Sequence, residues 1–251
     1  MIDLHAHLLP GIDDGAETME QSLKLARIAV AEGIQLVAAT PHHLNGRYVN
    51  SASDVEEAVQ HLRGKLAEER IPLQLITGQE IRVTGDLWTE WEQGRLLTLG
   101  GSRYLLLELP NNHVPRGFAD LIYEMTIQGL VPIIAHPERN VELADNPDLL
   151  MELVQLGAWG QVTSHSLNGR FGNRVMKTAM HMCKRNLIHI IASDAHDEVR
   201  RPFGMREAYA RIEKELDKAY VRYYMDNAKA VVKNVPKEIR TPMKRKRWFG
   251  F

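Results

Sequence analysis

The stretch that decides the fold is the first one, Met1-Ile-Asp-Leu-His-Ala-His7, in which a short apolar run ends in two histidines. In a β-strand, side chains at positions i and i+2 share a face, so the rings of His5 and His7 are expected to lie together. The chain then turns at Pro10-Gly11 and presents Asp13-Asp14. Two neutral imidazoles and a nearby carboxylate are the beginning of a divalent-metal site. Taken alone, the motif fits one buried structural histidine and one exposed histidine better.

Similar apolar runs recur along the chain and end near residues 7, 42, 80, 108, 136, 163 and 194. Successive ends lie 27 to 38 residues apart, which is the length of a βα unit, and the runs lack polar alternation, as parallel strands buried on both faces do. Seven such strands alternating with helices predict an α/β fold, either a barrel or a doubly wound sheet. No low-complexity linker divides the sequence, so one domain over residues 1–251 is expected.

Helices are expected between these runs from apolar periodicity and from residues that favour helix ends. Gly33 is expected to end the first helix, and Ser53 with Glu56 suggests a capping box at the start of the second. The segment 81–101 is expected to form a short helix and turns. The predicted helices cover residues 17–31, 53–69, 118–128, 147–156, 173–186, 205–216 and 219–233.

Composition narrows the possible partners and the compartment. The chain has 31 Lys+Arg and 32 Asp+Glu residues, so no strong field favours nucleic acid or a membrane. Its one cysteine, Cys183, cannot form an internal disulfide, which fits a reducing cytosol. No apolar run is long enough to span a bilayer, and the first strand begins at residue 2, which argues against a signal peptide. We therefore expect a cytoplasmic protein without a membrane span.

Polar residues with metal-binding side chains gather where the apolar runs end. Because barrel active sites form at the C-terminal ends of strands, these residues are expected to meet at one barrel mouth. Asp194-Ala-His196 repeats the i, i+2 spacing of His5-Ala-His7 at the other end of the chain, and barrel closure would bring the two strands together. Six of the seven ends carry such residues: His5 with His7, His42, Glu80, Glu108, His136, and Asp194 with His196.

The types of these side chains indicate the metal. Five imidazoles and four carboxylates, Asp14 included, with no thiolate, suit Mn, Fe or Zn in a multinuclear hydrolytic cluster. A structural zinc site would use thiolates and only four ligands. Nine ligands exceed the need of one ion, so two or three ions with a bridging carboxylate are expected.

Together these motifs resemble the polymerase-and-histidinol-phosphatase (PHP) superfamily, and within it the bacterial manganese-dependent tyrosine phosphatases of the CpsB/YwqE type. The likeness covers nearly the whole chain and implies a distorted, TIM-like barrel of seven strands. It rests on His5-x-His7, Asp14, Thr40-Pro-His42, Gly78-Gln-Glu80, Leu107-Glu108, Ala135-His-Pro-Glu-Arg139 and Ser193-Asp-Ala-His196.

The resemblance also implies a role for each site residue. Arg139 and Arg201 would bind the phosphate, the latter assignment competing with Arg200 and Arg206. The cofactor would be two or three Mn²⁺ ions, with Fe or Zn possible. The ions would be held by His5, His7, Glu80 and Asp194; by Glu80, Glu108 and His136; and by Asp14, His42 and His196.

The expected reaction is hydrolysis of phosphotyrosine on a bacterial tyrosine autokinase and its substrates, which control capsule or exopolysaccharide synthesis. A hydroxide bridging two metals would attack phosphorus while the arginines clamp the phosphoryl oxygens. His43 and His196 are candidate proton donors. A cysteine mechanism is excluded, because the Cys-x5-Arg pattern would need arginine where this chain has His189. Cys183 is expected to pack in a helix.

Two alternative functions stay open at this stage: a small-molecule phosphatase of the histidinol-phosphate type or a phosphodiesterase, and a non-catalytic module that binds phosphopeptides. Five side chains outside the motifs have weaker interpretations. His113 and His165 could line the substrate mouth or be ordinary histidines, His189 is expected in the core, and Trp88 and Trp91 are expected to pack a short helix. The basic and aromatic tail at about 240–251 suggests a solvated segment, or one that contacts an acidic partner or an anionic membrane surface.

Overall fold

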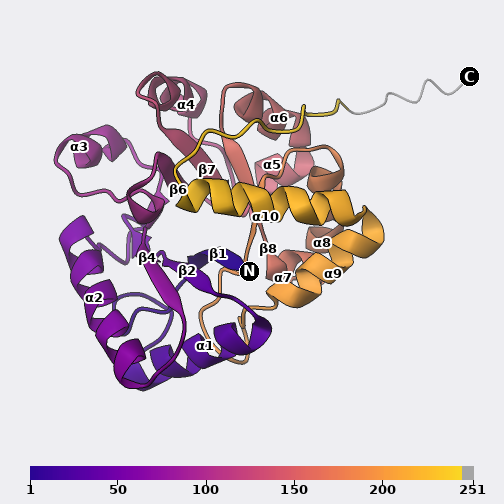
Figure 1. The fold of residues 1–251 in the computed structure, drawn as a ribbon. Coiled ribbons are helices and arrows are strands. Elements are labelled where there is room, and N and C mark those ends of the chain that lie inside the picture. Colours follow the sequence, from indigo (N-terminus) through magenta and orange to yellow (C-terminus); the bar gives the residue numbers. More distant parts are fainter. Residues whose placement is uncertain (245–251) are drawn as a thin grey trace, which may run out of the picture.

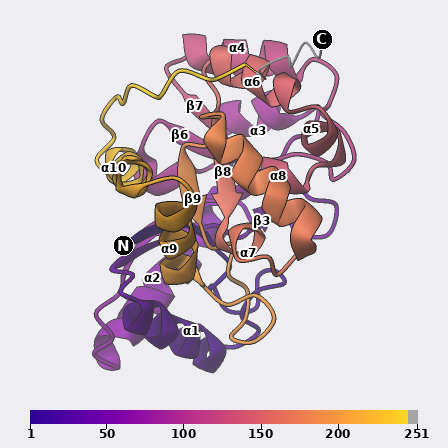
Figure 2. The same ribbon diagram turned by 90° about the vertical axis from the view of Figure 1, so that its right-hand side faces the viewer.

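A computed structural model describes residues 1–244 of the chain. Its strands form two sheets, both entirely parallel, with strand orders β1-β2-β4 and β3-β5-β6-β7-β8-β9. Helices surround the strands in Figures 1 and 2, as expected for alternating βα units. The strands are β1 (Ile2–Ala6), β2 (Leu36–Ala39), β3 (His42–His43), β4 (Gln74–Thr77), β5 (Glu80–Arg82), β6 (Tyr104–Glu108), β7 (Val131–Ala135), β8 (Trp159–Thr163) and β9 (Ile190–Ala192).

Two of the seven predicted strands are interrupted. The second divides into β2 and β3 around Pro41, which cannot donate to a ladder, and the third divides into β4 and β5 around Gly78. The barrel nevertheless closes between its first and last strands. The His7 N–H donates to the Ala195 carbonyl oxygen at 2.8 Å, and the Asp194 N–H donates to the His5 carbonyl oxygen at 2.8 Å. The predicted distorted seven-stranded barrel is therefore confirmed.

The helices begin and end within a few residues of the predicted positions. They are α1 (Met19–Glu32), α2 (Ala52–Glu68), α3 (Leu87–Glu92), α4 (Phe118–Ile127), α5 (Val141–Asp145), α6 (Pro147–Gln155), α7 (Ser164–Leu167), α8 (Gly172–Lys184), α9 (Met205–Glu215) and α10 (Lys218–Val232), with 3-10 turns η1 (Leu99–Gly101) and η2 (Pro137–Arg139).

Two predictions about helix ends have different outcomes. Gly33 ends α1 in the left-handed conformation, with φ of 88°, as expected. The predicted capping box of α2 is wrong by two residues. Ser51 is the N-cap, and its hydroxyl accepts from the Asp54 N–H while the Asp54 carboxylate accepts from the Ser51 N–H. The short helices α5 and α7 were not predicted.

Apolar side chains form two layers, one inside the barrel and one between strands and helices. On β6, Tyr104 and Leu106 belong to the inner layer and Leu105 and Leu107 to the outer layer, as the two-residue period of a strand requires. Helix α10, which crosses in front of the strands in Figure 1, adds Val231 to the inner layer. It therefore covers the end of the barrel at which the strands begin.

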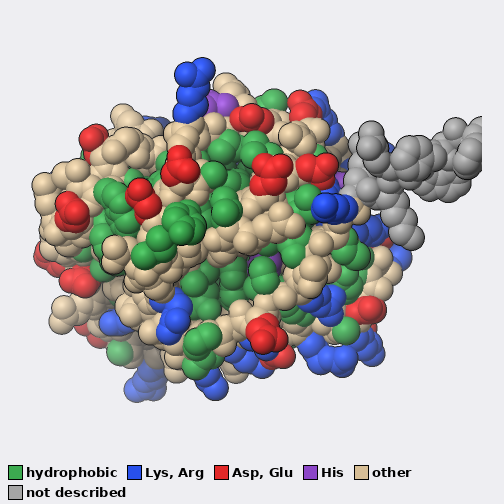
Figure 3. Space-filling view, turned by 90° about the horizontal axis from the view of Figure 1, so that it is seen from above, with side chains coloured by type: hydrophobic (Ala, Val, Ile, Leu, Met, Phe, Trp, Pro, Cys, Tyr) green, Lys and Arg blue, Asp and Glu red, His purple; other side chains and the backbone are tan. Residues whose placement is uncertain are grey.

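The surface mixes both signs of charge. On the face in Figure 3, acidic and basic side chains are interspersed among apolar ones, in keeping with the balanced composition. Among residues 1–244 there is no helix long and apolar enough to cross a membrane. Most of the tail predicted at about 240–251 lies outside the described residues.

Candidate metal centre

The predicted ligands gather at the end of the barrel opposite α10, because the inward-facing positions of the strands continue into polar residues. On β6, the inward series Tyr104, Leu106 ends in Glu108, and just beyond β9 the inward-facing Ala192 is followed two residues later by Asp194. His136 breaks this alternation with a left-handed backbone, at φ of 34°, which turns its ring toward the cluster. The barrel interior is thus apolar toward the end that α10 covers and polar at the opposite end, the mouth.

The first group comprises His5, His7, Glu80 and Asp194, all buried. The two histidine Nε2 atoms lie 3.1 Å apart, and each lies 3.3 Å from Glu80 Oε2 and 3.3 Å from Asp194 Oδ1. Ligand atoms about 2.0–2.1 Å from one centre at tetrahedral angles lie about 3.3 Å apart. The spacing of these four atoms therefore fits a first-row divalent ion between them.

A second group is built on His42. Its Nδ1 lies 2.9 Å from Glu80 Oε2 and 3.8 Å from Glu108 Oε2, so Glu80 is shared with the first group. The resemblance had placed His136 here. In the structure, His136 Nε2 lies 2.7 Å from the other oxygen of Glu80, Oε1. Both histidines therefore flank the bridging carboxylate.

The third group contains Asp14, His42 and His196, as the resemblance implied, together with His7. Asp14 Oδ1 lies 3.4 Å from His42 Nε2 and 3.3 Å from His196 Nε2. The Asp14 side chain is 42% exposed, whereas the His196 side chain is 4% exposed. This end of the cluster is the one nearest to solvent.

Unpaired buried atoms support the interpretation as a metal centre. Buried polar atoms normally have hydrogen-bond partners, and each exception requires an explanation, such as a bound ion. The atoms of the cluster that are buried without a hydrogen bond, although other ligand or charged atoms lie near them, are His42 Nδ1, Glu80 Oε2, Glu108 Oε2, Asp194 Oδ1 and His196 Nε2.

The protonation states also suit cation binding. Burial, and then the cation of Arg139, lower the pKa of His136 to about 4, so its ring is neutral and able to bind metal. Burial alone would raise the pKa of Glu80, but His5 and His42 hold it well below its usual range. Burial and the neighbouring Glu80 raise the pKa of Glu108 to about 7. A cation between these carboxylates would offset that repulsion.

Three side chains that orient this cluster were not predicted. Asp13 Oδ2 lies 2.6 Å from His7 Nδ1, and Gln161 Oε1 lies 2.9 Å from His5 Nδ1, so each leaves the Nε2 atom of its histidine to face the group. Arg82 Nη2 lies 3.0 Å from Glu108 Oε2. Asp13 follows a turn and Gln161 lies mid-strand, so only the alternation along β8 could have indicated Gln161.

Two guanidinium groups lie beside the cluster. Arg139 and Arg201 each contact Asp194 Oδ2, at 2.8 and 2.5 Å. The competing arginines make other contacts. The guanidinium of Arg206 donates to carbonyl oxygens at the end of α1, and Arg200 lines a neighbouring cavity together with Asp14 and His196. The structure therefore favours Arg201 over its two neighbours.

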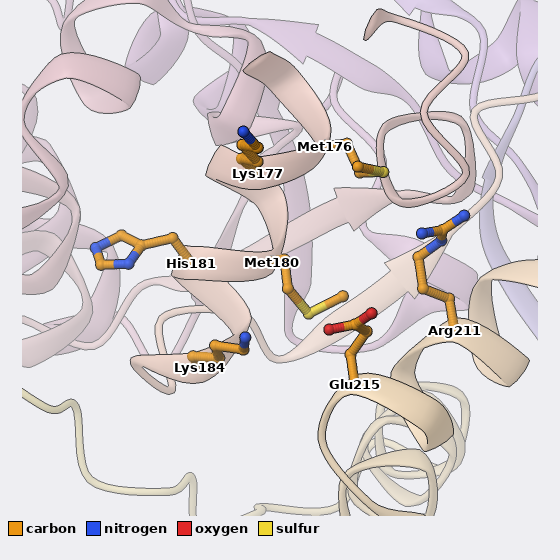
Figure 4. Close-up of a pocket in the computed structure, with 7 residues that line it drawn as sticks. All are labelled: Met176, Lys177, Met180, His181, Lys184, Arg211 and Glu215. Atoms are coloured by element: carbon orange, nitrogen blue, oxygen red, sulfur yellow. The ribbon is translucent and has the colours of Figure 1, made fainter. Parts of the chain in front are cut away.

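Five of the nine predicted ligands and the two arginines line an open cavity of about 350 Å³. Another cavity, of about 270 Å³, lies between α8 and α9 (Figure 4). Its lining has one carboxylate, Glu215, and one imidazole, His181, among three cationic side chains, which is too few ligands for a metal centre. The first cavity is lined by His42, Glu80, Glu108, Asn111, Asn112, His136, Arg139, Val141, Asp194 and Arg201.

The remaining histidines lie outside this cavity. His43 faces Glu90 of α3 at 3.7 Å, so its position does not support a role as proton donor at the cluster. His113 is exposed in a loop. His165 is buried, with Nε2 2.5 Å from the Pro202 carbonyl oxygen. His189 is buried in the core, as expected, and its Nδ1 accepts from the Gly160 N–H at 2.9 Å.

The other predicted packing residues agree with their surroundings. Trp88 and Trp91 pack against the outer apolar layer, and the Trp88 indole also donates to Glu124 at 2.8 Å. Cys183 is fully buried on α8, and burial raises its pKa to about 12. A thiol in this state is not a nucleophile at neutral pH.

A closed parallel barrel with imidazoles, carboxylates and arginines at its mouth is the architecture of metal-dependent barrel hydrolases. Comparison with known proteins narrows this class. Residues 1–233 match the family described as "Capsular polysaccharide synthesis, CpsB/CapC". The chain belongs to this family, which confirms the branch of the PHP superfamily that the motifs indicated.

Relatives match along the whole chain. The tyrosine-protein phosphatase YwqE of Bacillus subtilis is 42% identical, with all of both chains covered. The putative tyrosine-protein phosphatase CapC of Staphylococcus aureus is 38% identical, covering 100% of this chain and 99% of that protein. A structure from a study of YwqE and Streptococcus pneumoniae CpsB, described as "unique metal-dependent tyrosine phosphatases", superposes with a TM-score of 0.95, covering 98% of this chain and 100% of the other at 42% identity.

Proposed function

We propose that this chain is a metal-dependent protein tyrosine phosphatase. The observation that carries the proposal is the position of Asp194 between two kinds of group. Its Oδ1 faces the nitrogens of His5 and His7, and its Oδ2 faces the guanidiniums of Arg139 and Arg201. An anion in the adjacent cavity would thus face metal ions on the histidine side and guanidinium groups on the other side. The names of the relatives support phosphotyrosine as that anion.

Within this proposal, each group has a chemical task. The nine predicted ligands would hold two or three divalent ions, with Mn²⁺ as the proposed ion and Fe or Zn as alternatives. Such ions supply Lewis-acid charge and make water a nucleophile near neutral pH. Arg139 and Arg201 would fix the phosphoryl oxygens and stabilise the charge that develops on them, because a guanidinium donates two parallel hydrogen bonds to paired oxygens.

The leaving group needs little assistance from the protein. A tyrosine phenol has a pKa of about 10, far below that of a serine hydroxyl, so the phenolate can leave without a strong general acid. Burial holds the pKa of His196 to about 4, which keeps its ring unprotonated and favours a role as ligand over proton donor. His43 faces away from the cavity, so we assign no proton transfer to it.

The proposed biological substrate is a tyrosine-phosphorylated bacterial protein, in particular a tyrosine autokinase that controls capsule or exopolysaccharide synthesis. The description of the family supports the link to capsule synthesis. We further propose a cytoplasmic location, because Cys183, a free thiol, is compatible with the reducing conditions of the cytoplasm.

Phosphate release tests this function. Chelator-treated protein is incubated with a phosphotyrosyl peptide, with the matched phosphoseryl peptide and with histidinol phosphate, before and after Mn²⁺, Fe²⁺ or Zn²⁺ is restored. We expect release from the phosphotyrosyl peptide, restored best by Mn²⁺. His136→Ala should abolish this release. His61→Ala, a substitution on the exposed face of α2, is the matched control for histidine loss and should keep full activity.

Three other outcomes would contradict the proposal. Release only from histidinol phosphate would move the chain to a small-molecule branch. Release that survives removal of every metal would refute the metal centre. Stable binding of the phosphopeptide to metal-loaded protein without release would make the chain a binding module.

A further inference from the structure

Exposed apolar side chains occur in the loops around the barrel mouth. Val141 is 48% exposed and is the first residue of α5, and Phe171 is 38% exposed and directly precedes α8. Val141 lines the cavity that contains the metal-ligand cluster. Burial of such side chains normally stabilises a protein, so their exposure beside a charged cavity suggests a ligand with both charged and apolar parts.

Phe171 is placed directly against the phosphate-binding groups. The Arg139 guanidinium carbon lies 5.4 Å from the centre of the Phe171 ring. The Phe171 ring also contacts His165, whose ring is 5.8 Å away at an interplanar angle of 69°. His165 in turn contacts the carbonyl oxygen of Pro202, the residue after Arg201. The Phe171 ring therefore lies on the same side of the mouth as both arginines.

We propose that Phe171, with Val141, contacts the aromatic ring of the phosphotyrosyl substrate and selects it over phosphoserine. This inference rests on the proposed function. Phe171 contacts Arg139, and Val141 lines the same cavity as Arg139, so an ester group on a phosphate bound at this arginine would have apolar side chains beside it. A phenyl ring gains area burial and edge-to-face contact with Phe171, whereas the short serine side chain does not reach it.

The other aromatic side chain near the cavity is a weaker candidate. Tyr48 lies parallel to the ring of His42, at 6.2 Å and 6°, and the guanidinium of Arg47 lies 4.9 Å from the Tyr48 ring. It neighbours a proposed metal ligand, whereas Phe171 neighbours Arg139. A substrate whose phosphate lies on the arginines would direct its ring toward Phe171.

Binding and turnover together test the inference. On Mn²⁺-loaded protein, calorimetry gives the Kd of a peptide that carries phosphonomethyl-phenylalanine, a non-hydrolysable mimic, and the Kd of inorganic phosphate. For Phe171→Ala we expect about tenfold weaker binding of the peptide and an unchanged Kd for phosphate. Phe171→Tyr should bind the peptide like the native protein. Tyr123→Ala, which removes an exposed aromatic ring from α4, is the matched control and should change neither value.

Turnover measurements test whether Phe171 sets the preference for phosphotyrosine. The preference for phosphotyrosyl over phosphoseryl peptide, as a ratio of kcat/KM, should fall about tenfold in Phe171→Ala. Equal losses for phosphate, phosphoserine and phosphotyrosine would overturn the inference, because Phe171 would then only support Arg139. Unchanged peptide binding would overturn it too. An inactive native protein that binds neither peptide nor phosphate would overturn the proposed function, and the ring contact with it.

Discussion

Asp194 shows how one residue can connect the two halves of this site. It has a left-handed backbone, with φ of 58°, a conformation that costs about 1–3 kcal/mol in residues other than glycine. In return its carboxylate lies between His5 and His7 on one side and the two arginines on the other. Burial would raise its pKa, but Arg139, His5 and Arg201 hold it well below the usual range. It is therefore an anion throughout the neutral range.

The arginine assignment gives a direct prediction. Arg139→Ala should lower kcat/KM for the phosphotyrosyl peptide by about 10²–10³, the usual cost of losing one group that stabilises transition-state charge. Far-ultraviolet circular dichroism should show an intact fold. Arg206→Ala, which removes a guanidinium that serves the end of α1, should keep kcat/KM within about threefold. A folded Arg139→Ala protein with native kcat/KM would contradict its role.

Cys183 gives a second prediction at the residue scale. Because its thiol is buried and its pKa is raised to about 12, hardly any thiolate exists at pH 8. Iodoacetamide should therefore leave phosphatase activity unchanged. Ellman's reagent should titrate about one thiol only after the chain is unfolded in guanidinium. Rapid labelling of the native protein with parallel loss of activity would contradict a packing role.

At the scale of elements, the short helix α7 holds the loop that carries Arg201. The Ser164 hydroxyl donates to the Phe203 carbonyl oxygen at 2.5 Å, and the Asn168 amide donates to the Gly204 carbonyl oxygen at 2.9 Å. His165 adds a contact with the Pro202 carbonyl oxygen. Three side chains from one turn of helix thus fix three consecutive carbonyls just after Arg201.

Loosening this connection should reduce phosphate binding without removing any proposed ligand. Ser164→Ala is expected to raise the Kd for inorganic phosphate about three- to tenfold, because Arg201 loses its fixed position, and to cost about 1–3 kcal/mol of stability. The Mn²⁺ content of the protein, measured by atomic absorption, should not change. Ser164→Thr keeps the hydroxyl and should restore phosphate binding. If Ser164→Ala lost metal instead, α7 would support the cluster rather than Arg201.

The elements also show what sequence can and cannot predict. The seven strand ends and the histidines and carboxylates there were predictable, because the period of a parallel strand and the position of barrel sites are general rules. The breaks at Pro41 and Gly78 were not predictable. Each one interrupts the hydrogen-bonded ladder, but the chain continues in the same direction beyond it. Asp13 was missed because its role depends on which neighbour it faces, and that follows only from three-dimensional packing. Gln161 was missed although the alternation along β8 could have indicated its inward position.

On the scale of the whole molecule, the barrel is a stack of layers with different electrostatics. Helix α10 covers one end, an apolar layer fills the interior, and the charged cluster occupies the mouth. The apolar layer also encloses polar residues that must stay neutral. His189 is fully buried against Trp159, with ring centres 5.5 Å apart, and burial lowers its pKa to about 3. Acid stability of the fold therefore depends on such groups as well as on the mouth.

The sign of the His189 effect is fixed by proton binding. Between pH 6.5, its ordinary pKa, and about pH 3, the unfolded chain binds a proton that the folded chain does not, so stability falls as pH falls through this window. The loss approaches about 1.4 kcal/mol for each pH unit below 6.5. His189→Ala removes this penalty, but at pH 7.5 it leaves the Gly160 N–H without its acceptor and opens a cavity, at a cost of about 2–4 kcal/mol.

Together, the two effects predict that His189→Ala destabilises the fold less at acid pH than at pH 7.5. Urea unfolding of the native protein and of His189→Ala is compared from pH 7.5 to 4.5 in the presence of a chelator, so that metal binding contributes to neither curve. The difference in unfolding free energy should decrease by about 3 kcal/mol over the two units below pH 6.5. A difference that stays constant across this range would mean that His189 is protonated in the folded barrel, with a partner for its second nitrogen that the present geometry does not provide.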